Sequence, residues 1–204
     1  IRVSSTSRGL GDVYKRQPYK TIEELVAAAK EKGNLKASTN GNKASNHTAA
    51  QLLAKSAGFK YKAIPYGGTA DQLLALRQGE VDFTCAKVAD VAKLVKGDKP
   101  ELRVLAVFNT KRDPELPNVP TLGEKGLYPE WYGSARALVA PKGTKPEVIQ
   151  YYVEAFKKTM QDPAVIEAHK KAGMALDFKD NKELGDLIKA QDKFARDVVN
   201  DLYK

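Results

Sequence analysis

Two short stretches of this sequence bring small polar residues and glycine to points where a helix can begin. The first is Thr39–Asn46, TNGNKASN, in which Ser45 is a suitable N-cap residue. The unpaired N–H groups and the dipole of a helix N-terminus stabilise a bound carboxylate by ~0.3–1 kcal/mol at an exposed site, and by more when the site is partly buried. Ser45 and Asn46 can add a hydroxyl and an amide donor. The candidate ligand-binding residues in this stretch are Thr39, Asn40, Gly41, Ser45 and Asn46.

The second stretch is Tyr66–Thr69, YGGT. Its glycine pair allows the backbone to approach a ligand closely, and the threonine can donate its hydroxyl or cap a helix. The tyrosine hydroxyl can donate to the same ligand. The pair is not a dinucleotide-binding fingerprint, which needs a third glycine at a fixed spacing. The candidate ligand-binding residues in this stretch are Tyr66, Gly67, Gly68 and Thr69.

Each stretch also has an interpretation without a ligand. The first can be an ordinary helix-capping loop, and the second can be a plain turn between a strand and a helix. Tyr66 can be a half-buried packing aromatic. Spacing alone favours the capping loop and supports the two interpretations of Tyr66 equally.

Three further residues could carry chemistry at the same place. Lys87 follows a strand that ends near Cys85, so it should lie at the binding edge and could pair with a second acidic group on the ligand; a solvated lysine at a helix start is an equal alternative. Cys85 has no recognisable base beside it, which favours a small buried hydrophobe over a nucleophile. His47 has only His169 as a partner of its own kind, so we expect no metal site, and we expect His47 to orient the loop. No catalytic residue and no cofactor is predicted.

The candidate residues need strands and helices that bring them to one edge. Strands are predicted at 35–39, 60–65, 80–85 and 102–108, and helices at 45–57, 69–78 and 88–96. A capping box at Thr21–Glu24 begins an earlier helix that Gly33 ends. This alternation predicts a parallel, helix-covered α/β sheet. Right-handed crossovers would then place every strand-to-helix loop at one edge of the sheet.

The sequence after residue 108 carries fewer strand signals. Asn109–Pro120 holds three prolines and cannot form a helix or a central strand. Thr121 begins a second capping pattern, which predicts a short helix that Gly126 ends. The remaining predicted elements are strands at 134–140 and 174–178 and helices that begin after an N-cap at Thr144, at Asp162-Pro163 with an end at Gly173, and near Lys182.

Composition excludes several classes of protein. The 34 basic and 25 acidic residues give a net charge of +9, carried largely by lysines scattered over predicted helix faces. There is no basic run interleaved with aromatics, so we expect no nucleic-acid partner. The single cysteine excludes an internal disulfide, and no apolar run reaches the ~18 residues of a membrane helix. The printed sequence also begins without the apolar segment of a signal peptide.

Residues 1–17 differ from the rest of the chain. They lack helical or strand periodicity and are rich in serine, glycine and basic residues. Within them SRGLGDVYKRQ, Ser7–Gln17, resembles the translation of a sequencing-library adapter. We therefore expect 1–17 to be a non-native or disordered leader and exclude it from the fold.

From residue 18 to about 178 the chain resembles the Bug family, the periplasmic solute-binding proteins of tripartite tricarboxylate transporters. An ordered set of motifs with matching spacing carries the resemblance, and the proline-rich LPNVPTLGEKG is the most specific of them. The motifs include STNGNKASNH (Ser38–His47), IPYGG (Ile64–Gly68), GEVD (Gly79–Asp82), LPNVPTLGEKG (Leu116–Gly126), WYG (Trp131–Gly133) and APKGT (Ala140–Thr144).

The chain departs from the family pattern within the candidate site. Lys43 and Ala44 stand where the family usually has a second glycine and a serine. Gly67 replaces a common lysine, and Lys87 replaces a common small hydroxyl residue. These positions bear on which ligand is bound.

The resemblance implies a two-lobed α/β fold of the periplasmic-binding-protein type II kind, with the ligand in the cleft between the lobes. It places a complete, parallel-sheet second lobe at 18–130. Residues 131–204 would hold a crossover strand and the C-terminal part of an incomplete first lobe.

The resemblance also implies a non-enzymatic periplasmic receptor that delivers a small organic carboxylate to membrane transporter subunits. It shifts the balance at Asn40–Asn46 from a capping loop to a ligand site. Two alternatives stay open on the residues alone. One is an α/β enzyme acting on a small phosphorylated or carboxylated metabolite with Lys87 or Cys85 reactive, and the other is a chain that binds nothing well because half of its cleft is absent.

Overall fold

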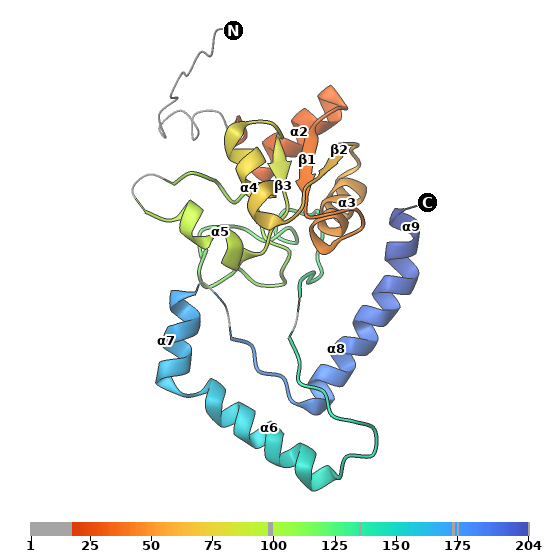
Figure 1. The fold of residues 1–204 in the computed structure, drawn as a ribbon. Coiled ribbons are helices and arrows are strands. Elements are labelled where there is room, and N and C mark those ends of the chain that lie inside the picture. Colours follow the sequence, from red (N-terminus) through yellow and green to blue (C-terminus); the bar gives the residue numbers. More distant parts are fainter. Residues whose placement is uncertain (1–17, 98–99, 135, 173, 175, 204) are drawn as a thin grey trace. The chain divides into compact units, whose positions relative to one another are not determined.

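The structure of the chain is a computed structural model that describes residues 18–97, 100–134, 136–172, 174 and 176–203 (Figure 1). The chain divides into two units, Ile1–Gly133 and Ser134–Lys204. The elements of the first unit are α2 (Ile22–Lys32), β1 (Lys36–Thr39), α3 (Ser45–Ala57), β2 (Lys62–Pro65), α4 (Thr69–Gln78), β3 (Phe83–Thr84) and α5 (Val88–Val95). Those of the second unit are α6 (Pro146–Met160), α7 (Pro163–Lys171), α8 (Asn181–Phe194), a π-helical turn (Ala195–Val199) and α9 (Asn200–Leu202).

Helix α2 begins and ends where its capping residues predict. The hydroxyl of Thr21 accepts from the backbone N–H of Glu24 at 3.2 Å. The Glu24 carboxylate accepts from the backbone N–H of Lys20 at 2.6 Å. A standard capping box would use the N–H of the next residue, Thr21. Gly33 ends the helix with φ 66°, a left-handed conformation that suits glycine.

The sheet of the first unit has three parallel strands in the order β2-β1-β3. Ala37 of the central strand pairs with Ala63 on one side and with Phe83 on the other. The N–H of Tyr66 donates to the carbonyl of Thr39 at 2.8 Å, which continues the β1–β2 ladder to the end of both strands. The predicted parallel α/β sheet is therefore confirmed.

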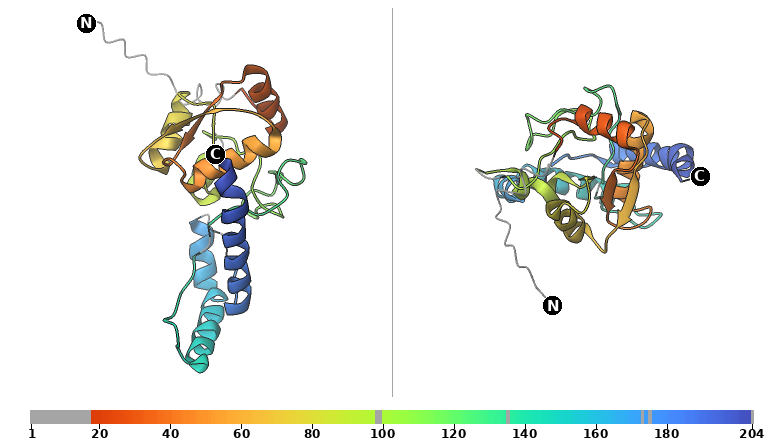
Figure 2. Two further views of the ribbon diagram at one scale, coloured as in Figure 1. Left: turned by 90° about the vertical axis from the view of Figure 1, so that its right-hand side faces the viewer. Right: turned by 90° about the horizontal axis from the view of Figure 1, so that it is seen from above.

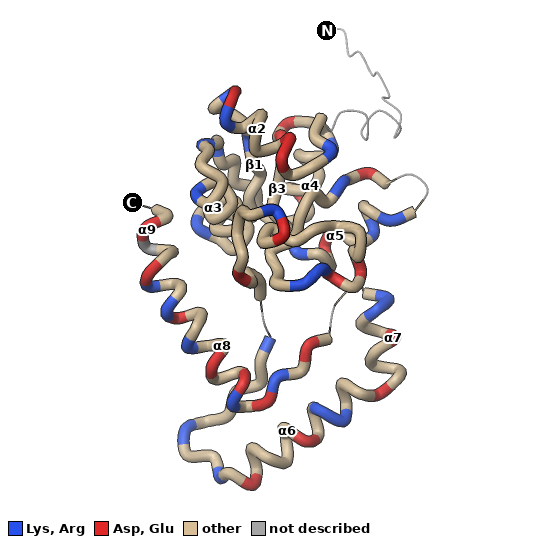
Figure 3. Tube along the Cα trace, turned by 180° about the vertical axis from the view of Figure 1, so that it is seen from behind, with Lys and Arg blue, Asp and Glu red and all other residues tan. Residues whose placement is uncertain are grey.

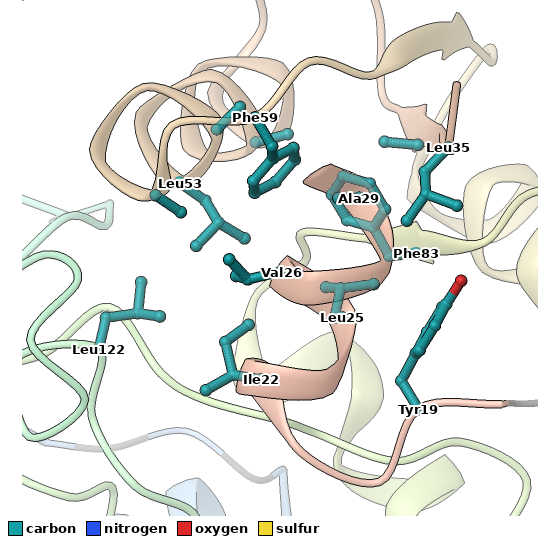
Figure 4. Close-up of a cluster of buried hydrophobic side chains, with 14 residues drawn as sticks. Tyr19, Ile22, Leu25, Val26, Ala29, Leu35, Leu53, Phe59, Phe83 and Leu122 are labelled. Atoms are coloured by element: carbon teal, nitrogen blue, oxygen red, sulfur yellow. The ribbon is translucent and has the colours of Figure 1, made fainter. Parts of the chain in front are cut away.

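Helices cover both faces of this sheet. Ala37 belongs to the core that α2 and α3 form with Leu53, Phe59 and Leu122 (Figure 4). The next side chain along β1, Ser38, donates its hydroxyl to a carbonyl of α4 instead. Because successive strand side chains point to opposite faces, α2 and α3 lie on one face and α4 on the other. Figure 2 shows α2 and α4 on opposite sides of the strands.

The predicted strand at 102–108 is wrong, although part of its sequence is buried. Leu102 packs against Leu73 and Val91, and Val107 is also buried. The backbone of Val107 bonds to Pro120 and Leu122, which yields a single bridge between Val107 and Thr121 rather than a ladder. An apolar run is thus buried by side-chain packing without strand pairing.

The short helix predicted after Thr121 is also absent. The hydroxyl of Thr121 accepts from the N–H of Glu124 at 3.0 Å, as a cap would. The following bonds, from Lys125 to Leu122 and from Gly126 to Gly123, are three residues long and form turns. The capping pattern is present, but only turns follow it.

In the second unit the helices are correct and the strands are not. The described residues of 134–140 and of 174–178 form no strand. Ala135 and Ala175 lie outside the described residues, as does Gly173, the predicted end of α7. The N-cap of α6 is Lys145 rather than Thr144, whose hydroxyl donates to the carbonyl of Pro141.

The helices of the second unit leave apolar side chains exposed. Neither α6, α7 nor α8 has a buried residue, and Val148, Tyr152 and Phe156 lie exposed on one face of α6. Figure 3 shows basic and acidic residues interspersed along α6 and α8, which fits the predicted scatter of charge. None of the described helices has the length and apolar character to cross a membrane.

Candidate functional site

The carboxyl ends of three parallel strands meet at one edge of the sheet. These ends are Thr39 of β1, Pro65 of β2 and Thr84 of β3. Each is followed within a few residues by the N-terminus of a helix: α3, α4 and α5. The N-termini of α3 and α4 thus lie at the same edge, as the alternation of strands and helices predicted. Free backbone N–H groups gather at such an edge and favour an anion.

The loop between β1 and α3 is held by its own polar groups. Asn40 accepts at Oδ1 from the N–H of Asn46 at 3.3 Å, and the hydroxyl of Thr39 donates to the carbonyl of Gly41. The N-cap is Ala44, with no side-chain bond, so the predicted cap at Ser45 is wrong by one residue. Ser45 is instead the first helical residue and is exposed. Asn40, from six residues earlier, satisfies one N–H of the first turn.

His47 orients this loop, as its position predicted. Its Nδ1 accepts from the backbone N–H of Lys43 at 2.9 Å, which places the imidazole proton on Nε2. Lys43 has φ 57°, a left-handed conformation that is unusual for a residue other than glycine. His47 is only 7% exposed, and this burial lowers the pKa of its imidazole.

The second stretch presents an open helix start. Gly68 is the N-cap of α4, in an extended conformation with no side-chain bond, and Thr69 is the first helical residue. A methyl group on Gly68 would meet no atom within 4 Å, whereas one on Gly67 would lie 3.5 Å from the Asp71 carboxylate. The phenol of Tyr66 donates to Glu80 at 3.2 Å. Burial raises the pKa of Tyr66, and so do the hydrogen bond to Glu80 and the charge of that carboxylate.

Lys87 and Cys85 follow the third strand. Lys87 is the N-cap of α5 and is exposed. Burial of the sulfur raises the pKa of the Cys85 thiol to about 12, the opposite of what an activated nucleophile requires. Across the described residues, no group of three or more His, Cys, Asp or Glu side chains could hold a metal ion.

A hollow of ≈ 260 Å³ opens at the ends of β1 and β2. It is lined by Thr39, Asn42, His47, Ala63 and Pro65. Thr39 was a predicted site residue, but Asn42 was not singled out in the sequence. This volume is below the ~300–1,000 Å³ that small-molecule pockets usually occupy.

The sequence also failed to point to Gln72, which the structure brings to the centre of this edge. It is 0% exposed, and its Oε1 accepts from Nδ2 of Asn46 at 2.9 Å. The one feature of the sequence that could have pointed to Gln72 is its place next to Leu73, within the apolar stripe of α4. That signal is weak, because an amide at such a position is more often solvated.

The arrangement defines a class of protein: a parallel α/β lobe with three helix starts at one sheet edge. The sequence model of the tripartite tricarboxylate transporter family receptors, TctC, matches residues 5–202. The chain therefore belongs to the TctC family, which confirms the resemblance and the α/β fold class. The match begins inside the segment 1–17. That segment lies outside the described residues, so its interpretation as a non-native or disordered leader stays a prediction.

Several known proteins are similar to the chain. It is 37% identical to the UPF0065 protein in gbd 5'region of Cupriavidus necator over 72% of the chain and 44% of that protein. A TctC solute binding protein from Polaromonas, solved with no ligand, matches with a TM-score of 0.79 and 28% identity over 90% of the chain and 62% of that protein. The R. palustris protein Rpa4515, solved with adipate, matches with a TM-score of 0.72 and 22% identity over 88% of the chain and 61% of that protein. The chain thus spans about half the length of the curated relative.

Proposed function

We propose that the chain is the ligand-binding part of a solute receptor that captures a small organic carboxylate for a tripartite tricarboxylate-type transporter. One observation carries the proposal. The N-caps of α3, α4 and α5, which are Ala44, Gly68 and Lys87, make no side-chain capping bond. Elsewhere Thr21, Asp162 and Asp180 make such bonds, whereas Lys145 of α6 does not. What distinguishes α3, α4 and α5 is that their starts lie together at one sheet edge, where backbone N–H groups favour an anion. One of these groups, the N–H of Asn46, donates to Asn40.

The proposed ligand is a dicarboxylate. One carboxylate would lie where α3 and α4 begin, and Lys87 at the start of α5 offers a cation for the second acidic group. The adipate-bound protein of R. palustris shares the fold and supports this class of ligand. The proposed ligand-binding residues are Thr39, Asn40, Gly41, Ser45, Asn46, Tyr66, Gly67, Gly68, Thr69 and Lys87.

The proposal extends to the lobes and the location of the protein. Residues 18–130 would form the second lobe of a two-lobed receptor, and 131–204 would form the crossover and the C-terminal part of the first lobe. The exposed apolar face of α6, with Tyr152 and Phe156, supports a packing partner for this part. The receptor would work in the periplasm and deliver its ligand to membrane transporter subunits.

The proposed receptor is not an enzyme. The enzyme alternative required Lys87 or Cys85 to react. The raised pKa of Cys85 disfavours its thiolate at neutral pH, and Lys87 is an exposed helix cap. An exposed lysine lacks the desolvation that activates a catalytic amine.

Titration calorimetry of the whole chain with adipate tests the proposed function. Adipate should bind saturably, while 1,6-hexanediol, which has the same chain length without charge, should not bind. Absence of binding by adipate, succinate, malate and citrate alike would contradict the proposal. A second protein carries the amino-terminal part of the Polaromonas binding protein before residue 18. If an incomplete cleft prevents binding, this fusion should bind adipate; if the ligand class is wrong, it should not bind adipate either.

A further inference from the structure

One buried glutamine joins the elements that meet at the site edge. Gln72 lies in the first turn of α4, and its side chain is fully buried. A buried carboxamide is costly unless its donors and acceptor find partners. Those of Gln72 do find partners, and the partners come from three other elements.

The nitrogen of this side chain contacts the ends of two strands. Nε2 of Gln72 donates to the carbonyl of Ser38 at 3.1 Å and to the carbonyl of Cys85 at 2.7 Å. It also contacts the hydroxyl of Thr84, which itself donates to the carbonyl of Ser38 at 3.0 Å. The amide therefore ties the end of β1 to the end of β3.

The oxygen of the same side chain contacts the neighbouring helix. Oε1 accepts from Nδ2 of Asn46 in the first turn of α3 at 2.9 Å. Asn46 is 5% exposed, and its own backbone N–H donates to Asn40 in the loop before α3. The hydroxyl of Ser38 donates to the backbone carbonyl of Gln72 at 3.0 Å. The orientation of the loop 40–46 thus depends on a residue of α4.

We propose that Gln72 is a positioning residue that sets the first turns of α3 and α4 relative to each other and thereby sets ligand affinity. It acts through Asn46 and the loop 40–46 and touches no ligand itself. The inference rests on the proposed carboxylate-binding function.

A carboxamide suits this position, because its nitrogen donates two hydrogen bonds while its oxygen accepts one. Methionine would keep the volume of Gln72 but would leave the amide of Asn46 and two carbonyls without this partner, a loss that is costly in a buried site. Glutamate would keep the acceptor and would place a carboxylate against the carbonyls of Ser38 and Cys85. Both substitutions should loosen the loop.

The test compares Gln72→Met with Gln78→Met in the whole chain. Gln78 ends the same helix and is exposed, so it is a matched control. The two readouts are adipate affinity by calorimetry and hydrogen exchange of the amides at 40–46 in the ligand-free protein. Gln72→Met should weaken adipate binding about tenfold, a factor that corresponds to ~1.4 kcal/mol, and should speed exchange at 40–46 more than in α2. Gln78→Met should change neither readout.

Several outcomes would overturn the inference. A folded Gln72→Met protein with unchanged affinity and unchanged exchange at 40–46 would do so, and so would exchange that rises equally throughout the chain. If Gln72→Met does not fold, Gln72→Asn, which keeps the amide but shortens its reach, should show the same two effects. If the parent chain binds none of adipate, succinate, malate and citrate, the proposed function fails, and the exchange comparison alone decides whether Gln72 positions the loop.

Discussion

The backbone N–H of Lys43 donates to Nδ1 of His47 across 2.9 Å and closes the loop between β1 and α3. The bond needs a neutral imidazole, because a protonated ring has no acceptor nitrogen. It also holds Lys43 in a left-handed conformation with φ 57°. A titratable side chain therefore controls the shape of the proposed binding loop.

Lowering the pH should destabilise the protein through His47. Burial lowers the pKa of this residue below its ordinary value of 6.5, so the folded state binds the proton less readily than the unfolded chain. Neutral His47 contributes to the free energy of unfolding above the ordinary pKa of the unfolded chain. This contribution is lost as the pH falls from that pKa toward the lower pKa of the folded state. Urea unfolding from about pH 7.5 to about pH 5.5 should show a smaller loss of stability in His47→Gln than in the parent. His169→Gln is the control and should keep the loss seen in the parent.

A methyl group at Gly68 should weaken ligand binding without unfolding the protein. The backbone of this residue is extended, and a Cβ there would meet no atom within 4 Å. It would, however, stand at the start of α4, where the proposed carboxylate approaches the backbone. Gly68→Ala should lower adipate affinity about tenfold in calorimetry, equivalent to ~1.4 kcal/mol.

Gly185→Ala in α8 is the matched control for Gly68→Ala. A Cβ at Gly185 also has open space, and alanine in a helix interior should raise stability by ~0.5–1 kcal/mol. Adipate affinity should not change in this variant. Equal affinity in Gly68→Ala and in the parent would show that the ligand does not approach this backbone.

Removing the charge of Lys87 should affect dicarboxylates more than monocarboxylates. Lys87 begins α5 at the site edge and is exposed. Lys87→Gln should reduce adipate affinity about fivefold and weaken its salt dependence, because one screened charge pair is lost. Hexanoate, with a single carboxylate, should bind both proteins alike. Lys93→Gln, an exposed lysine of the same helix, should leave adipate affinity unchanged; equal losses in both variants would indicate a general charge effect.

Leu122 should be among the costliest side chains to truncate. It is 1% exposed and packs in the core that α2 and α3 form (Figure 4). Leu122→Ala should lower the free energy of unfolding by ~2–5 kcal/mol, as is usual for a buried leucine. Leu74→Ala, at a position that is 45% exposed, should cost about 1 kcal/mol or less. Urea unfolding of the two variants measures the difference, and similar midpoints would contradict this description of the core.

Several elements could be predicted from the sequence because their signals are local. Thr21 caps α2 within its own first turn, and Gly33, Gly58 and Gly79 end helices in the left-handed conformation. The alternation of short apolar runs with these helices implied a parallel sheet and a common edge for the helix starts. The grouping of candidate residues at that edge followed from this pattern.

The tertiary structure alone decided the remaining features. The segment 102–108 has the composition of a strand, but a ladder requires a partner, and the segment finds only the bridge from Val107 to Thr121. In the sequence, Gln72 is one polar residue beside Leu73. Its proposed role depends on hydrogen bonds to Ser38 and Asn46, which lie 34 and 26 positions away along the chain. Helix caps are encoded within a few residues, whereas strand pairing and buried hydrogen bonds depend on distant parts of the chain meeting in space. This is the physical reason that the sequence by itself determined most of the helices and the common edge of α3, α4 and α5, while the folded chain selected the residues that hold that edge together.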